Sequence, residues 1–162
     1  GYTFQGGVSE VNEKVSVVDF FNQFVMPELA SNKVDTHPIM KADALKYLTT
    51  FRKQLPKETI NGVITPVVNM LQAHSFVVHT YAAVAIDRIF AIRDVDPNNP
   101  KVSAFRYNIA QLEPVLDPVF SNLFKILENS SQAENEYVMK AVMRVIVTAK
   151  SRLASVTGIV LE

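Results

Sequence analysis

The sequence contains no cysteine and shows no excess of charge of either sign. Without cysteine the chain forms no disulfide and no zinc–thiolate site, which is compatible with a reducing cytoplasm or nucleus. Its 16 basic side chains balance its 16 acidic ones, and they form no dense basic cluster along the sequence. Because binding to many phosphates requires such a cluster, we expect no direct nucleic-acid partner.

Long hydrophobic runs are also missing. The longest, such as 63–68 and 145–147, are far shorter than the roughly 20 apolar residues that a membrane-spanning helix requires. We therefore expect no membrane partner. The first residue is glycine and no signal peptide is readable, so we expect an internal segment of a longer protein.

Glycine is scarce as well, and this bears on catalysis. The five glycines form no phosphate-binding loop, and no serine or threonine lies in a nucleophile elbow. The acidic residues Glu134 and Glu136 are best explained as favourable charges in the first turn of a helix. No combination of acid, base and nucleophile is readable, so the sequence predicts neither an enzyme nor a cofactor.

The histidines do not suggest a metal site. The closest two, His74 and His79, are five positions apart and therefore do not share one helix face. Five methionines are expected to fill the core, with a methionine-rich ligand groove as the alternative: Met26, Met40, Met70, Met139 and Met143.

The stretch Asp94–Asn98 matches the opening of a calcium-binding loop. The match fails at the sixth position, where Asn99 replaces glycine, and at the twelfth, where Phe105 replaces glutamate. The sequence therefore predicts no metal ion here and a proline-rich solvated loop over 94–101.

With 48% apolar residues, the chain has enough hydrophobic side chains for a continuous core. These residues recur at the three- and four-residue spacings of amphipathic helices, and no strand-like alternation is needed. We expect Asp35 or Thr36 to cap the second helix and Ser131–Glu134 to form a capping box for the last. The sequence predicts an all-α fold with helices over 15–29, 38–55, 56–71, 76–92, 112–127 and 131–153. In the tail from 155 to 162 it predicts a turn and the beginning of a further helix.

One pattern occurs three times, in Pro38–Leu45, Phe76–Ala83 and Tyr137–Arg144. Aligned on the basic residue that follows two apolar ones, the copies lie 38 and 61 positions apart, which brackets the length of a paired-helix repeat. The chain is thus expected to be a single piece of a solenoid, which presents an extended surface to other macromolecules. The predicted repeats cover 8–33 (partial), 36–73, 76–128 (with an insertion over 94–101) and 131–162 (incomplete).

The aligned basic residues are Lys41, His79 and Lys140. A polar residue recurring within an apolar helix is either a surface position or part of a polar ladder between repeats, and the structural role is favoured. Four arginines are left as possible contacts to an acidic partner: Arg88, Arg93, Arg106 and Arg144.

Several stretches together resemble one known family, and they follow its order: His37–Leu48, Phe51–Glu58, Val77–Ala83, Ser121–Phe124, and Glu134–Ala141 with Met143 and Arg144. They are similar to the central region of the importin-α re-exporters, the CAS proteins of the importin-β superfamily. The resemblance covers roughly 11–144. It implies a right-handed α-solenoid of HEAT-type antiparallel helix pairs.

The resemblance also implies a function for the full-length parent. Such a protein binds importin-α together with the GTP form of Ran in the nucleus and releases both in the cytoplasm, with hydrolysis carried out by Ran. The chain would then be part of a non-catalytic scaffold that shuttles between nucleus and cytoplasm. The alternatives are a generic HEAT scaffold with no Ran dependence and, with least support, an enzyme domain.

The second helix of each pair lines the inner surface of the arch in this superfamily. We therefore expect polar residues of those helices to face a partner on the concave side: Glu58, Asn61, Asn69, Glu113, Asp117 and Asn122. Both ends of the array are expected to expose apolar faces, which favour self-association of the fragment.

Overall fold

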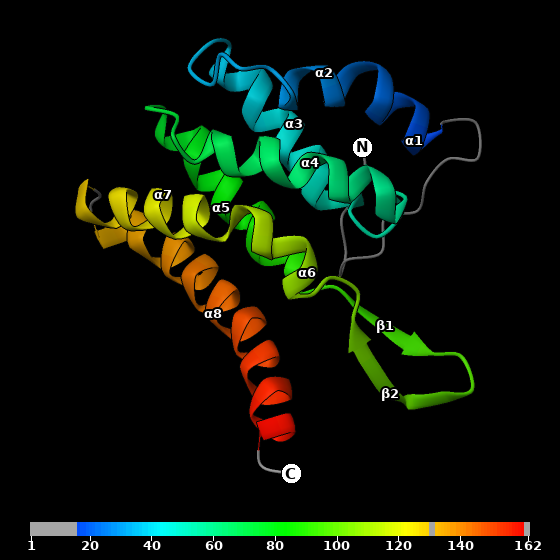
Figure 1. Ribbon diagram of the computed structural model, residues 1–162. Helices are drawn as coiled ribbons and strands as arrows, with labels where there is room; N and C mark the ends of the chain where they lie inside the picture. The colour runs from blue at the N-terminus through cyan, green and yellow to red at the C-terminus, as the bar shows by residue number, and fades with distance from the viewer. Residues whose placement is uncertain (1–15, 130–131, 161–162) are drawn as a thin grey trace.

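The computed structural model describes the backbone of residues 16–129 and 132–160, and the side chains of residues 16–129 and 136–150. It opens with one helical run made of α1 (Val17–Phe20), the π-helical segment η1 (Phe21–Val25) and α2 (Met26–Leu29). Helices α3 (Pro38–Phe51), α4 (Lys57–Met70) and α5 (Phe76–Phe90) follow (Figure 1). The remaining elements are strands β1 (Arg93–Asp96) and β2 (Asn99–Phe105), α6 (Ile109–Leu112), the 3-10 turn η2 (Glu113–Val115), α7 (Leu116–Asn129) and α8 (Gln132–Val160).

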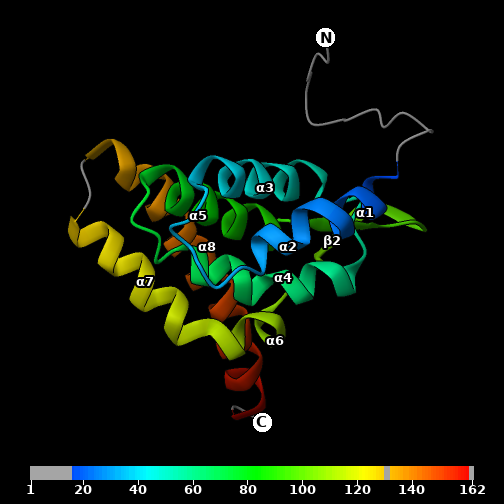
Figure 2. The ribbon, with the colours of Figure 1, turned by 90° about the horizontal axis from the view of Figure 1, so that it is seen from above.

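The helices form two layers. One layer contains α3, α5 and α8, which pack side by side, and the other contains α2, α4 and α7 (Figure 1, Figure 2). Helix α5 lies at the centre and contacts α3, α4 and α8. Its small residues Ala82, Ala83 and Ala85 are 0% exposed, which lets the neighbouring helices approach closely. The sandwiched helix that the sequence predicts over 76–92 is therefore confirmed.

The first helical run contains a wide turn just before Pro27. In this turn the amide of Met26 donates to the carbonyl oxygen of Phe21, five residues earlier. Proline cannot donate a backbone hydrogen bond and its ring crowds the preceding turn, so a π-helical turn lets the helix continue to Leu29. Part of the helix predicted over 15–29, residue 15, lies outside the described residues.

The start of α3 differs from the prediction. Pro38 occupies the first turn as expected, but the residue at the cap is His37, in the left-handed region with φ 47°. Asp35 accepts hydrogen bonds from His74 instead, and the hydroxyl of Thr36 donates to the carbonyl of Lys33 at 2.8 Å. The expected cap at Asp35 or Thr36 was wrong because both side chains have other partners.

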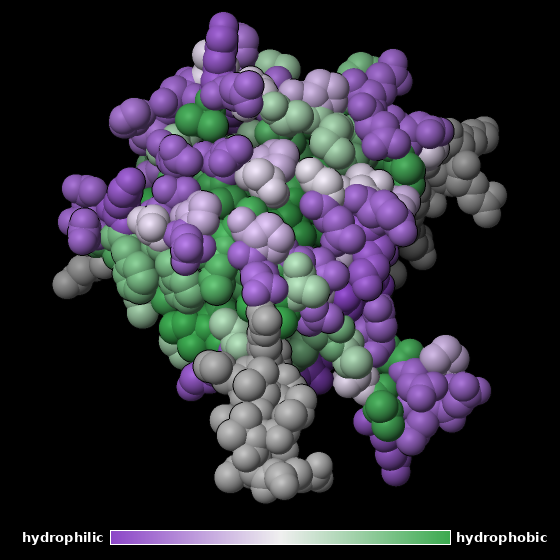
Figure 3. Space-filling model, viewed as in Figure 1, coloured by the Kyte–Doolittle hydropathy of each residue, from purple (hydrophilic) through white to green (hydrophobic). Residues whose placement is uncertain are grey.

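The predicted solvated loop over 94–101 was also wrong, because these residues belong to an antiparallel β-hairpin. Pro97 and Asn98 form its tight turn, in which the amide of Asn98 donates to Asp96 at 2.8 Å, and Asn99 and Pro100 begin β2. Every residue of both strands is exposed, and the hairpin projects from the helices as a separate arm (Figure 1, Figure 3).

The last helix is longer than predicted. The expected turn after 153 is absent from the described backbone, where α8 continues to Val160. The single glycine in this stretch, Gly158, costs only about 1 kcal/mol in a helix interior, and no proline interrupts it. Ser131, the first residue of the expected capping box, lies outside the described residues.

Among the described residues, no helix combines the length and the apolar character needed to cross a lipid bilayer.

In the face shown in Figure 3, apolar surface gathers toward α7 and α8, whereas the hairpin is mostly polar. The core runs continuously through both layers, from Val17 in α1 to Val145 in α8.

Candidate functional site

Helices α4 and α7 present a row of polar side chains to solvent. Glu58, Asn61 and Asn69 are exposed on α4, and Glu113 and Asp117 are exposed in η2 and at the start of α7. The opposite faces of both helices are buried, at Val63 and Val67 in α4 and at Val119 and Leu123 in α7. The five residues therefore lie on the outer face of one layer, where a macromolecular partner can reach them.

Asn122, the sixth predicted residue, is placed differently. Its side chain is only 6% exposed, and its amide nitrogen donates to the carbonyl oxygen of Val68 in α4 at 3.5 Å. Asn122 lies five positions after Asp117, and at 3.6 residues per turn this rotates its side chain by about 140°, toward the neighbouring helix. Asn122 thus joins α7 to α4 and is not available to a partner in this segment.

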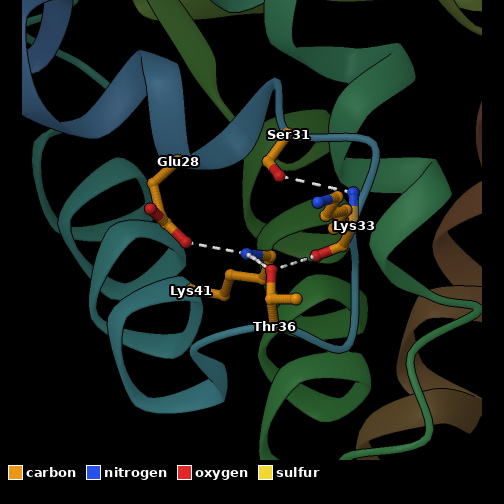
Figure 4. Close-up of polar contacts among 5 residues, drawn as sticks. All are labelled: Glu28, Ser31, Lys33, Thr36 and Lys41. Atoms are coloured by element: carbon orange, nitrogen blue, oxygen red, sulfur yellow. Dashed lines mark hydrogen bonds and ion pairs between the residues drawn. The ribbon is translucent and has the colours of Figure 1, made fainter.

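The recurring basic position has three different environments. The ammonium of Lys41 is buried and lies 2.7 Å from Glu28 and 3.3 Å from the hydroxyl of Thr36 (Figure 4). The ring nitrogen Nδ1 of His79 is 3.0 Å from the carbonyl oxygen of Ala73. Lys140 is exposed and pairs with Glu136 one turn earlier. These residues do not form one ladder, since only the first two bind groups on other elements.

A shallow groove lies on the other layer, where α5 and α8 meet. Its floor is apolar and its rim contains two ion pairs, Arg144 with Asp87 and Lys140 with Glu136. The apolar side chains are all partly exposed and come from one face of α8: Met139 (44%), Met143 (54%) and Val147 (45%).

The methionine prediction was therefore wrong for this helix, because Met139 and Met143 line a groove and do not fill the core. Met40 is also exposed, at 58%, whereas Met70 is fully buried as expected. Spacing alone did not separate these cases, since an apolar residue on the outer face of a helix has the same periodic neighbours as one on the inner face.

Two ion pairs tie the turns together. Oδ1 of Asp35 accepts a hydrogen bond from the backbone amide of His74 at 2.7 Å. Oδ2 of Asp35 lies 2.9 Å from the ring nitrogen Nδ1 of the same histidine. This hydrogen bond lowers the pKa of Asp35 and raises that of His74. At the base of the hairpin, Arg106 binds both carboxylate oxygens of Asp94 at 2.6 to 3.0 Å, and this hydrogen bonding lowers the pKa of Asp94.

Within the described part of the chain, no group of three or more histidine, aspartate or glutamate side chains is arranged to hold a metal ion. The polar groups on the surface instead form rows along helices and pairs across turns. Such an arrangement suits binding of another protein along an extended surface, which is the kind of surface that solenoids present.

Comparison with known proteins gives consistent matches along the whole chain. A family model described as Cse1 matches residues 1–86, and a model described as CAS/CSE protein, C-terminus, matches residues 87–162. The boundary between the two lies inside α5, so the two matched regions share one helix and one core.

The relatives include the proteins named exportin-2 from Bos taurus, at 43% identity, and from Homo sapiens and Oreochromis niloticus, each at 42%. Each match extends over 142 residues, which is 88% of this chain. The chain spans only 14% of the length of these relatives. The stacked helix pairs and the family matches together confirm the predicted HEAT-type helical fold class, and the chain belongs to the CAS/Cse1 family.

Proposed function

We propose that the chain is a segment of a nuclear transport receptor that carries importin-α out of the nucleus together with Ran-GTP. The observation that supports this most is the identity with exportin-2 proteins, which continues through helices of both layers. In this proposal the protein shuttles between nucleus and cytoplasm. It acts as a scaffold without catalytic activity of its own.

The physical basis of such a cycle is linkage between two ligands. If Ran-GTP and importin-α each bind the same wound conformation of the array, each raises the affinity for the other. Stacked helix pairs suit this role, because small rotations between neighbouring pairs add up along a solenoid. We expect these rotations at contacts between neighbouring helices of one layer, such as those of α5 with α3 and α8.

The repeat division stays part of this proposal. Helices α3 and α4 lie within 36–73, α5 lies within 76–128, and α7 ends one residue beyond that range, at Asn129. With this division α4 and α7 are the second helices of their pairs. We propose that their exposed polar row, Glu58, Asn61, Asn69, Glu113 and Asp117, contacts a partner protein on the concave side of the arch.

A pull-down with the full-length parent tests the function. Immobilised receptor is mixed with importin-α and with Ran loaded with either GTP or GDP. We expect importin-α to be retained with Ran-GTP and not with Ran-GDP. Equal retention in both nucleotide states would favour the second candidate, a HEAT scaffold that organises a different complex.

The same assay tests the polar row. Replacing its five residues by alanine in the parent should weaken retention of importin-α by about tenfold, which corresponds to roughly 1.4 kcal/mol spread over several contacts. The matched control replaces Asp43 and Lys46 by alanine, because both are exposed on α3 in the other layer. If both variants lower the retention of importin-α equally, the polar row is not a specific contact with the partner.

We also propose that the 162-residue chain self-associates through the apolar end formed by α1, η1 and α3. Phe20 and Phe24 are 42% and 58% exposed, and Phe20 lies 5.1 Å from the ring of Tyr47. Sedimentation velocity should show a concentration-dependent dimer that Phe20→Ser/Phe24→Ser abolishes. A chain that stays monomeric at all concentrations would contradict this.

A further inference from the structure

Six basic side chains meet at the edge of the molecule where α3 and α5 end and the hairpin begins. We call them the basic edge: Arg52, Lys53, Lys57, Arg88, Arg93 and Arg106. We propose that the basic edge binds an acidic segment of a partner protein. The proposal does not depend on the transport function, because it rests on the charges and contacts of this chain alone.

Arg106 connects the hairpin to the turn between α3 and α4. Its guanidinium binds Asp94 of β1 and also donates to the carbonyl oxygen of Lys53 at 3.4 Å. The pKa of Asp94 is lowered first by the hydrogen bond from Arg106 and further by the charges of Lys57 and Lys53. Three cations from separate elements therefore lie around one carboxylate.

Arg52 and Arg88 extend the cluster toward the other side of the same turn. The pKa of Arg52 is lowered first by burial and then by the charge of Arg88, while the charge of Asp87 opposes this shift. The Nη1 atom of Arg52 donates to the carbonyl of Thr49 at 2.6 Å, while its buried Nε atom has no hydrogen-bond partner among the described residues. Arg88 is exposed on the last turn of α5.

The cations outnumber the acids at this edge. Asp94 is already bound to Arg106, and Asp87 is bound to Arg144 of α8. The carboxylates left there are Glu58 on α4 and Asp96 at the tip of the hairpin. Helices α3 and α5 run in the same direction and both end here, and the partial negative charge of their C-terminal ends stabilises cations without a carboxylate. The charge of the basic edge thus remains available to a ligand.

Apolar groups beside the cations favour a peptide over a nucleic acid. Arg93 lies over the ring of Phe105, 4.1 Å from its centre, and Phe105 is 38% exposed. Val95 and Val102 on the same hairpin are 56% and 50% exposed. A peptide segment that carries carboxylates and an apolar side chain can pair with the cations of the basic edge and also contact these apolar side chains. The chain as a whole carries no net charge, so it lacks the long positive field that attracts a phosphate backbone.

The test measures binding of defined probes to the purified 162-residue chain. The probe is a short fluorescein-labelled peptide in which glutamates flank one phenylalanine. Its binding is measured by fluorescence anisotropy at several salt concentrations. The variant is Lys53→Glu/Lys57→Glu. Its matched control, Lys33→Glu/Lys125→Glu, changes the net charge equally at exposed lysines away from the basic edge. Thermal melts of both variants check that the helices remain folded.

We expect the peptide to bind with salt-dependent affinity, and Lys53→Glu/Lys57→Glu to weaken it about tenfold or more. The control should change it less than about twofold. If the double variant melts early, Arg88→Glu serves in its place, because this side chain is exposed. No binding of the peptide, equal losses in variant and control, or tighter binding of a single-stranded oligouridine than of the peptide would each overturn the proposal.

Discussion

The ammonium group of Lys41 lies 2.7 Å from Oε1 of Glu28, joining α3 to α2 across the two layers. The Lys41 side chain is 1% exposed and that of Glu28 is 21% exposed. Because the loss of one charge leaves its partner half-buried and unpaired, we expect Lys41→Met to lower the free energy of unfolding by about 1.5 to 3 kcal/mol. Urea denaturation followed by circular dichroism measures this.

The control for this prediction is the double variant Glu28→Leu/Lys41→Met. It removes both charges and keeps apolar volume, so it should recover a large part of the lost stability. A double variant as unstable as the sum of the two single variants would show that the charges do not interact, contrary to the prediction.

The pair of Asp35 and His74 should make stability depend on pH. The pKa of His74 is raised above 6.5, so its contribution is complete below that pH and disappears as the pH rises through the higher value in the folded state. The pKa of Asp35 is lowered, so its contribution disappears only as the pH falls through that lower value. We expect His74→Ala to lower Tm at about pH 5.5 and to have little effect at about pH 9.

Asp35→Ala is the informative comparison. The carboxylate also accepts the backbone amide of His74, a bond that His74→Ala leaves in place. Asp35→Ala should therefore lower Tm at both pH values, and by more than His74→Ala at the alkaline one. Identical pH profiles for the two variants would mean that the ring nitrogen contributes nothing beyond the backbone contact.

Close packing around α5 predicts a cost for a larger side chain at Ala85. This residue is 0% exposed, on a helix that contacts both α3 and α8. We expect Ala85→Leu to destabilise the fold by about 1 to 3 kcal/mol, because the added atoms force neighbours from their preferred rotamers. Val77→Leu, at a position 44% exposed on the same helix, should change stability by less than about 0.5 kcal/mol. Chemical denaturation of both variants decides the matter, and equal stability would argue against tight packing here.

The hairpin should loosen when Arg106 is removed. An isolated two-stranded hairpin is marginally stable in water, and here the guanidinium fixes its base to Asp94 and to the carbonyl of Lys53. We expect Arg106→Ala to speed amide hydrogen exchange in β1 and β2 and to leave α4 unchanged. Lys101→Ala, at an exposed position near the tip, is the control. Unchanged exchange in the hairpin would show that strand pairing alone holds it.

The helices were predictable because their information is local. The spacing of apolar residues placed α4 and α5 within a few residues, and α4 continues through Gly62 and Pro66. The hairpin was missed because its base is joined by Arg106 to a carboxylate twelve residues earlier, a contact that no short stretch of sequence reveals. Pro97 and Asn98 do form the turn, but Asn99 and Pro100 belong to β2, and the strands on either side are short and wholly exposed.

The candidate site was predictable only in part, for the same reason. The outward direction of Glu58 and Asn61 follows from the apolar stripe of their own helix. The inward direction of Asn122 depends on Val68, which is 54 residues away in the sequence. The exposure of Met143 likewise depends on where α5 ends beside α8, which one helix does not determine.

The position of the family boundary within α5 has a practical meaning for dissecting this protein. Residues 86 and 87 are consecutive positions of a single helix, and Ala82, Ile86 and Ile89 are buried on both sides of that point. Dividing the chain there would give two halves that each expose apolar side chains that are buried in the intact fold. A division in the turn at 52–56 or at 71–75 leaves every helix whole. The turns between helices, and not the boundary between the two family models, are therefore the places to divide this protein into fragments.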